Sequence, residues 1–296
     1  MATLRELKTR IGSVASSEKI TGAMKMISSA KVHKFELSLK QLVPYRNQIK
    51  SIMGHILSSG TDFSSPLIET RQEVNRIAVV VYGSDDGLCG AYNINIFKSA
   101  YAEIQRLHAE YGNGVEMDLY PIGKKMAKAL AKIAGPKMHI VVPQGVDSKM
   151  PSEKVNELTH LLREKFSAGE YDMVCVGYMK FYSMSRQRPV FEQLFPIAGE
   201  TLLEGSDSAD SNRLYIFEPD PNRIFNAVLP MFVLSTMQEI TIENRASEQA
   251  ARVMAMQSAN DNAKKLLEGL QLEYNKLRQE SITTELLDIL GGQVER

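Results

Sequence analysis

Residues 249–277 read QAARVMAMQSANDNAKKLLEGLQLEYNKL, and this stretch decides the architecture of the chain. One face of it recurs in alternating steps of four and three residues, which is the heptad spacing of a coiled coil. All but two members of this face are apolar: Gln249, Val253, Met256, Asn260, Ala263, Leu267, Leu270, Tyr274 and Leu277. From about Gln238 to Leu290 there is no proline and one glycine, Gly269. The pattern predicts a continuous helix of roughly fifty residues, about 75 Å long.

A single helix cannot bury such a face alone, so it needs a partner helix. The N-terminal segment offers one, because the same spacing begins there and is expected to resume after a polar interruption at 16–18. The predicted members are Leu4, Leu7, Ile11, Val14, Ile20, Ala23, Ile27 and Ala30. Residues 1–50 carry ten Lys/Arg against three Glu (+7), and residues 239–296 carry seven against ten acidic residues (−3). We therefore expect the two termini to pair as an antiparallel coiled coil; a homodimer of the C-terminal helix is the alternative.

Composition narrows the class of protein. The chain has 296 residues, 44% of them hydrophobic and 24% charged, and its net charge is zero. Neutrality argues against a dedicated nucleic-acid-binding protein. No apolar run reaches the roughly 18–20 residues that span a bilayer, and the start, MATLRELKTR, lacks the apolar core of a signal peptide. Two cysteines, Cys89 and Cys175, make no disulfide framework, so a reducing cytosol is expected.

Between the two ends, apolar strand-like runs alternate with helical patterns. RIAVVVY at 76–82 and YDMVCVGY at 171–178 are typical of buried strands, and the alternation predicts an α/β sheet. Further strands are predicted at 117–121, 139–142, 191–197 and 213–217. Helices are predicted at 3–57, 92–111 and 124–134, and two more begin at 152 and 222. Residues 58–73 are predicted to be a polar linker and residues 199–212 an acidic loop. The predicted fold class is α/β: a long antiparallel two-helix coiled coil from both termini with an inserted Rossmann-like domain. Its segments are an N-terminal shaft helix (1–60), the α/β domain (74–215) and a C-terminal shaft helix (220–296).

The loop Gly87-Leu88-Cys89-Gly90, after a predicted strand and before a predicted helix, is the most site-like feature. A helix N-terminus in this place can bind phosphate. The loop matches neither GxxxxGK[ST] nor GxGxxG, however, and Asp85 and Asp86 would repel an anion. We interpret it as a tight turn or docking loop.

The remaining candidates for chemistry are weak. The five histidines are scattered without ligand spacing, Cys89 has no local base, and no nucleophile elbow is present. The sequence therefore predicts no catalytic residue, no cofactor and no metal site.

Blocks of sequence at both ends and in the middle resemble the gamma subunit of the rotary F-type ATP synthases, of bacterial type. The blocks are RIGSV at 10–14, KITGAMKMISSAK at 19–31, GLCGAYN at 87–93, EQAARVMAM at 248–256, NA at 262–263, YNKLRQ at 274–279 and ITTE at 282–285. They follow the order of the family and cover essentially the whole chain. Gln293 departs from the alanine usual in the family, and the redox-regulatory cysteine insert of chloroplast members is missing.

This resemblance implies a central rotor shaft of a proton-translocating ATP synthase, which couples rotation of the membrane c-ring to conformational cycling of the catalytic beta subunits. The implied partners are the alpha and beta subunits, the epsilon subunit and the c-subunit ring. The implied location is peripheral, on the cytoplasmic face of the cell inner membrane, with no membrane span and no nucleic acid bound. The chain itself would be non-catalytic, because the catalytic residues of the family belong to beta.

The resemblance also implies contacts with the beta subunits at Met24, Arg252, Arg278, Gln279, Thr283 and Glu285. The apolar end of the C-terminal helix would serve as a bearing; its members are Ile282, Leu286, Leu287, Ile289 and Leu290. The competing classes are an α/β nucleotide-binding protein with a coiled-coil dimerisation arm and a purely structural tether.

Overall fold

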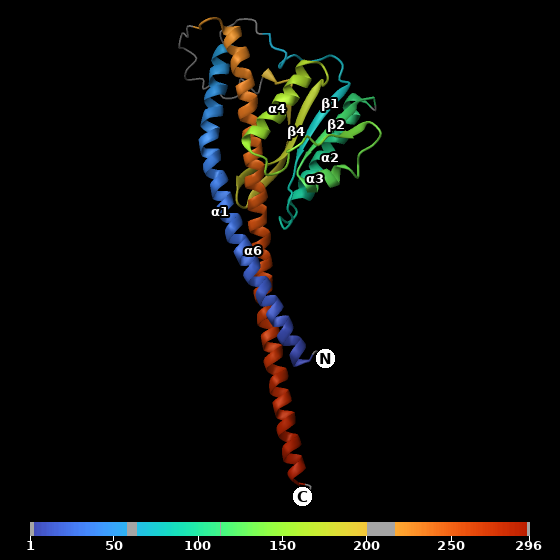
Figure 1. The fold of residues 1–296 in the computed structure, drawn as a ribbon, viewed down its shortest axis with the longest axis vertical. Coiled ribbons are helices and arrows are strands. Elements are labelled where there is room, and N and C mark those ends of the chain that lie inside the picture. The colour runs from blue at the N-terminus through green and yellow to red at the C-terminus, as the bar shows by residue number, and fades with distance from the viewer. Residues whose placement is uncertain (1–2, 58–63, 113, 200–216, 295–296) are drawn as a thin grey trace. The chain divides into compact units, whose positions relative to one another are not determined.

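The computed structural model describes residues 3–112, except 58–63, and residues 114–199 and 217–294. The predicted acidic loop and the strand predicted at 213–217 lie outside the described residues, apart from Gly199 and Phe217. The chain forms two compact units: unit 1 contains residues 1–29 and 252–296, and unit 2 contains residues 30–251. Two long helices, α1 (Leu4–Leu57) and α6 (Pro221–Val294), contribute to both units (Figure 1).

Unit 2 is built on a five-stranded sheet of order β3-β2-β1-β4-β5. The first four strands run parallel, and the edge strand β5 is antiparallel to β4. The strands are β1 (Arg76–Tyr82), β2 (Glu116–Ile122), β3 (Met138–Ile140), β4 (Met173–Ser183) and β5 (Arg186–Phe195), and the helices between them are α2 (Tyr92–Tyr111), α3 (Lys124–Leu130) and α4 (Ser152–Ser167). This arrangement confirms the predicted α/β class.

Both faces of the sheet are covered, which explains the unbroken apolar run of β1. Ala78, Val80 and Tyr82 face a core with α4 and with parts of α1 and α6 that include Met53 and Phe225. The alternate residues Ile77, Val79 and Val81 face a second core with α2 and α3. Figure 1 shows these two layers on opposite sides of the sheet. Successive side chains of a strand point to opposite faces, so a strand buried on both sides is apolar throughout.

Three element boundaries differ from the prediction by more than two residues. The strand predicted at 171–178 continues to Ser183, where β4 pairs with β5. The strand predicted at 191–197 begins earlier, at Arg186, because its first half lies on the edge of the sheet and carries polar residues that break the apolar pattern. The helix predicted at 124–134 ends at Leu130, where turns replace the helix.

Among the described helices, α6 alone is long and apolar enough to cross a membrane by length and composition. Half of its most apolar 18-residue window is nevertheless buried inside the fold. Phe225, Leu229, Phe232 and Met237 of α6 belong to the core beside the sheet. The composition of α6 is therefore that of a core helix.

In unit 1, the predicted packing face of α6 is confirmed. Between 261 and 280, every described residue outside this face is exposed, whereas Ala263, Leu267, Leu270, Tyr274 and Leu277 are wholly or partly buried. The partner is α1 of the same chain, because the side-chain amide of Asn260 donates to the carbonyl oxygen of Glu18 at 2.7 Å. The antiparallel pairing of the two termini is thus intramolecular.

The predicted packing face of α1 is right in its first half and wrong in its second. Leu4, Leu7, Ile11 and Val14 are buried or half-buried, but Ile20 and Ile27 are 59% and 58% exposed, and Ala23 and Ala30 are also exposed. The same three-four steps continue instead through four polar or small residues: Glu18, Thr21, Lys25 and Ser28. The prediction chose the apolar residues Ile20 and Ile27, which lie on a different face of α1. The face that packs on α6 is polar at this point, because it meets Asn260.

Candidate functional site

In an open α/β sheet, ligands bind at the carboxyl ends of the strands, where the strand order reverses. Here the order reverses between β1 and β4, and the loop that follows β1 contains the predicted site residues Gly87, Leu88, Cys89 and Gly90. This edge is therefore the first place to test for a small-molecule site.

Side chains of α6 fill that edge. The Asn244 side-chain oxygen accepts hydrogen bonds from the Tyr92 hydroxyl (2.7 Å) and from the Met179 backbone N–H (3.2 Å). The Ser247 hydroxyl donates to the Met179 carbonyl oxygen at 2.9 Å. The chain's own helix thus occupies the place at which such folds take a ligand, and this weighs against the alternative of a nucleotide-binding protein.

Asp85 fixes the loop after β1. Its carboxylate accepts from the Lys124 backbone N–H (2.9 Å) and from both the N–H and the hydroxyl of Ser148 (3.1 and 2.7 Å). Partial burial opposes ionisation, but the hydrogen bonds from Ser148 and Lys124 outweigh it and hold the pKa of Asp85 below its usual value. An ionised, fully bonded carboxylate here is a structural clamp, since its oxygens are already used.

The same loop presents one apolar side chain to solvent. Leu88 has a positive φ of 62° and is 60% exposed, whereas its neighbour Cys89 is buried. A leucine in the left-handed region is unusual and strained, and such outliers concentrate at functional sites. The Cys89 thiol is buried and lies 3.4 Å from the amide nitrogen of Asn93, so a reactant has little access to it. The loop is suited to docking a partner through Leu88 and unsuited to nucleophilic chemistry.

The six predicted contact residues fall in two groups along unit 1. Since Asn260 lies opposite Glu18 and Thr21, the antiparallel register brings Met24, which is half-buried, within about one helical turn of the buried Arg252. The second group, Arg278, Gln279, Thr283 and Glu285, is exposed on the last turns of α6.

The end of α6 has no partner within the described chain. By the same register Leu4, where α1 begins, lies opposite residues 274–277. Figure 1 shows α6 continuing beyond the start of α1. Every residue from 282 to 290 is exposed, and its five large apolar side chains are 48–63% exposed: Ile282, Leu286, Leu287, Ile289 and Leu290. Contiguous exposed apolar surface marks an interaction site.

Sequence reasoning missed a second exposed apolar group on α1, formed by Ile20, Met26 and Ile27. Two of these residues were assigned to the internal packing face. The seven-residue spacing of Ile20 and Ile27 was the available signal, but spacing alone does not tell which of two faces a helix turns inward.

Comparisons with known proteins agree with this geometry. A family model described as ATP synthase matches residues 3–294. The ATP synthase gamma chain of Parabacteroides distasonis is 38% identical over 292 residues, which cover 99% of this chain and 98% of the relative. The ATP synthase gamma chain of Bacteroides thetaiotaomicron is 35% identical over 310 residues, with full coverage of both chains.

Solved structures share the fold. A chain in the cryo-EM structure of the Euglena gracilis mitochondrial ATP synthase (OSCP/F1/c-ring, rotational state 3) matches with a TM-score of 0.61 and 18% identity, over 98% of this chain and 93% of that one. A chain in the rotor of the same enzyme, rotational state 1, matches with a TM-score of 0.55 and 17% identity, over 94% and 98%. Together the comparisons define the class of protein, a subunit of an ATP synthase. The chain belongs to the ATP synthase gamma chain family.

Proposed function

We propose that this chain is the central rotor of a proton-translocating F-type ATP synthase, which transmits rotation of a c-subunit ring to catalytic beta subunits. The observation that carries the proposal is the apolar end of α6 from Ile282 to Leu290, exposed beyond its helical partner. An apolar helix end is unfavourable in water and needs a surrounding partner. A ring of alpha and beta subunits would supply one that holds the end without fixed ion pairs.

Contacts that change with rotation are proposed at the two groups of unit 1. Arg278 and Gln279 project from the exposed face of α6, next to the packing residue Leu277. Arginine can hold a carboxylate of a beta subunit in a bidentate fork, and glutamine can donate and accept. Charge-assisted hydrogen bonds of about 1.5–3 kcal/mol each would bias one beta subunit and still release at each step. Thr283 and Glu285 extend this polar group, and Met24 and Arg252 form the second one.

The α/β unit is proposed to face the membrane side of the complex. The exposed Leu88 on the strained loop of Gly87, Leu88, Cys89 and Gly90 supports a docking role, with the epsilon subunit and the c-ring as the proposed partners. The protein would then be peripheral, on the cytoplasmic face of the inner membrane. Catalysis is proposed to lie on beta; in support, Asn244 and Ser247 stand at the carboxyl edge of the described sheet, where such folds take a ligand.

The test is reconstitution with alpha and beta subunits. The purified chain alone should hydrolyse no ATP, and adding it should raise the turnover of alpha and beta. The double variant Arg278→Ala/Gln279→Ala should assemble, as judged by gel filtration, and should lower that turnover. Lys264→Ala/Lys265→Ala, a matched pair of exposed residues on α6, is the control. ATP hydrolysis by the isolated chain would contradict the rotor proposal, whereas wild-type turnover of the double variant would contradict only the assignment of the contact residues.

A further inference from the structure

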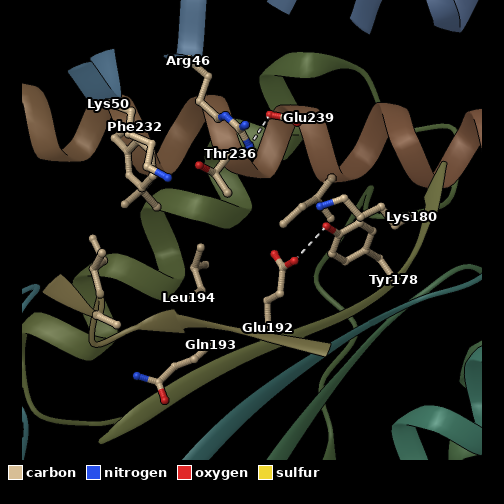
Figure 2. Close-up of a pocket in the computed structure, with 14 residues that line it drawn as sticks. Arg46, Lys50, Tyr178, Lys180, Glu192, Gln193, Leu194, Phe232, Thr236 and Glu239 are labelled. Carbon is tan, nitrogen blue, oxygen red and sulfur yellow. Dashed lines mark hydrogen bonds and ion pairs between the residues drawn. The ribbon is translucent and has the colours of Figure 1, made fainter. Parts of the chain in front are cut away.

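A cavity of about 490 Å³ lies within unit 2 between α1, α6 and the β4–β5 hairpin. Figure 2 shows Arg46 reaching into it from α1, Thr236 and Glu239 from α6, and Glu192 from β5. Its volume is in the range of small-molecule sites, roughly 300–1,000 Å³. Its lining shares no residue with the contacts described above at the strand edge or with the exposed end of α6.

The wall of the cavity is divided by chemistry. One part is apolar and is formed by Leu194, Ile197, Phe232 and Val233. The other part is charged: Figure 2 shows the Tyr178 hydroxyl bonded to Glu192, and Arg46 paired with Glu239. A molecule that fills such a space needs an apolar body and a polar head, which is the usual composition of a ligand pocket.

Three buried polar atoms on the wall have no hydrogen-bond partner among the described residues: Arg46 Nε, the Thr236 hydroxyl oxygen and Glu239 Oε2. Two of them, the Nε–H of Arg46 and the hydroxyl of Thr236, can donate to a ligand. Arg46 Nη1 contacts the Glu239 carboxylate at 2.8 Å, so the guanidinium is held in place by its other edge. Buried polar groups without partners are costly, and a single acceptor oxygen supplied by a ligand would relieve the donor of Arg46.

The charges on the wall favour an anionic head. Arg46, Lys50 and Lys180 contribute three positive charges, from α1 and β4, against two carboxylates, Glu192 and Glu239. Burial raises the pKa of Glu239, although the charge of Arg46 opposes this shift. The side chains that line the cavity thus include one more cation than carboxylate, while Glu243 lies near Lys180 and Arg46 without lining it.

We infer that this cavity is a binding site for a small amphipathic anion, a carboxylate on an aliphatic chain. Its head accepts from Arg46 Nε and Thr236, and its tail packs on Phe232 and Leu194. Such a ligand would tie the β4–β5 hairpin to both long helices within unit 2. The inference does not depend on the rotor function.

The test is isothermal titration of the full-length chain with three probes: octanoate, octylamine with the same tail and a cationic head, and acetate with the head alone. Octanoate should bind at least tenfold more tightly than either of the others. Arg46→Lys keeps the charge opposite Glu239 but removes the Nε–H, and Thr236→Val is nearly isosteric. Each should weaken octanoate binding about tenfold, as expected for loss of one hydrogen bond to a charged group.

Lys132→Gln, an exposed substitution outside the cavity, is the matched control and should bind octanoate like the wild type. Thermal unfolding of each variant establishes that it is folded. Equal affinity for octanoate and octylamine would mean that the tail alone binds by non-specific hydrophobic contact. This result would overturn the proposed anion site. Wild-type affinity in both folded cavity variants, or no binding of octanoate to the wild type, would overturn it equally.

Discussion

Units 1 and 2 differ in how their large apolar side chains are buried. In unit 2 each face of the sheet is covered, so Ile77, Val79 and Val81 are buried on one side and Ala78, Val80 and Tyr82 on the other. In unit 1 one face of each helix is buried and large apolar side chains elsewhere stay exposed, among them Ile20, Met26, Ile27 and Leu272. The difference indicates that unit 2 encloses a core of its own, although side chains such as Leu88 and Ile94 stay exposed on it, whereas unit 1 buries only the seam between two helices.

Burial predicts very different costs for the same chemical change in the two units. Ile77→Ala removes a fully buried side chain from unit 2 and should lower the free energy of unfolding by about 2–5 kcal/mol. Ile27→Ala removes a side chain that is 58% exposed and should change it by no more than about 0.5 kcal/mol. Urea unfolding of the isolated chain measures both.

The pair of variants also separates folding from assembly. Ile27→Ala should weaken binding of the chain to alpha and beta subunits while leaving its own stability unchanged. Equal destabilisation by the two substitutions would mean that the exposed face of α1 is packed within the chain, and the contrast between the units would fail.

Unit 2 should also lose stability as the pH rises from about 4.5 to about 7. Burial raises the pKa of Glu243 to about 7, although Lys180 opposes the shift. The folded state therefore keeps a proton that the unfolded chain releases near pH 4.5. The stabilisation is complete below that pH and is lost as the pH rises to about 7, by up to about 3 kcal/mol.

The measurement is the free energy of unfolding from pH 5 to 8, for the wild type and for Glu243→Gln. Asp85 and Asp172 have lowered pKa values and act at lower pH, so the difference between the two proteins isolates Glu243. The variant should gain on the wild type as the pH rises. Parallel pH profiles would show that the carboxyl is ionised throughout.

The smallest expected loss of stability comes from the hydrogen bond between Asn260 and Glu18 in unit 1. Asn260→Ala removes the hydrogen bond to the Glu18 carbonyl oxygen and should destabilise the helix pair by about 1 kcal/mol. Amide hydrogen exchange, read separately for α1 residues of unit 1 and for β1, distinguishes the units. Faster exchange in unit 1 with β1 unchanged is expected, whereas faster exchange in both would contradict their independence.

The sequence predicted the elements whose residues carry a complete pattern. The strand β1 was predicted with its observed bounds, because burial on both faces makes RIAVVVY apolar throughout. The half of β5 before Phe191 was missed, since an edge strand need not be apolar. Ile20 and Ile27 were placed on the wrong face, because the hydrogen bond of Asn260 lets the true face be polar.

The candidate sites also differ in how much of each could be predicted from the sequence. The proposed docking loop and the apolar end of α6 are each continuous in sequence, so both could be proposed without a structure. The cavity could not be found, because Arg46, Lys180, Glu192 and Thr236 are far apart along the chain and are brought together by tertiary packing. Its distinguishing property, a buried Nε–H to which no described residue is hydrogen-bonded, exists only in the folded protein.

Hydrogen exchange of the end of α6 tests the central claim most directly. Amides of residues 282–290 should exchange rapidly in the isolated chain, where this segment has no helical partner, and much more slowly once alpha and beta subunits are added. Amides of β1 should exchange at the same rate in both states, since unit 2 is already complete. Unchanged rapid exchange at 282–290 in an assembled, ATP-hydrolysing complex would contradict the claim that this end is the surface a partner encloses.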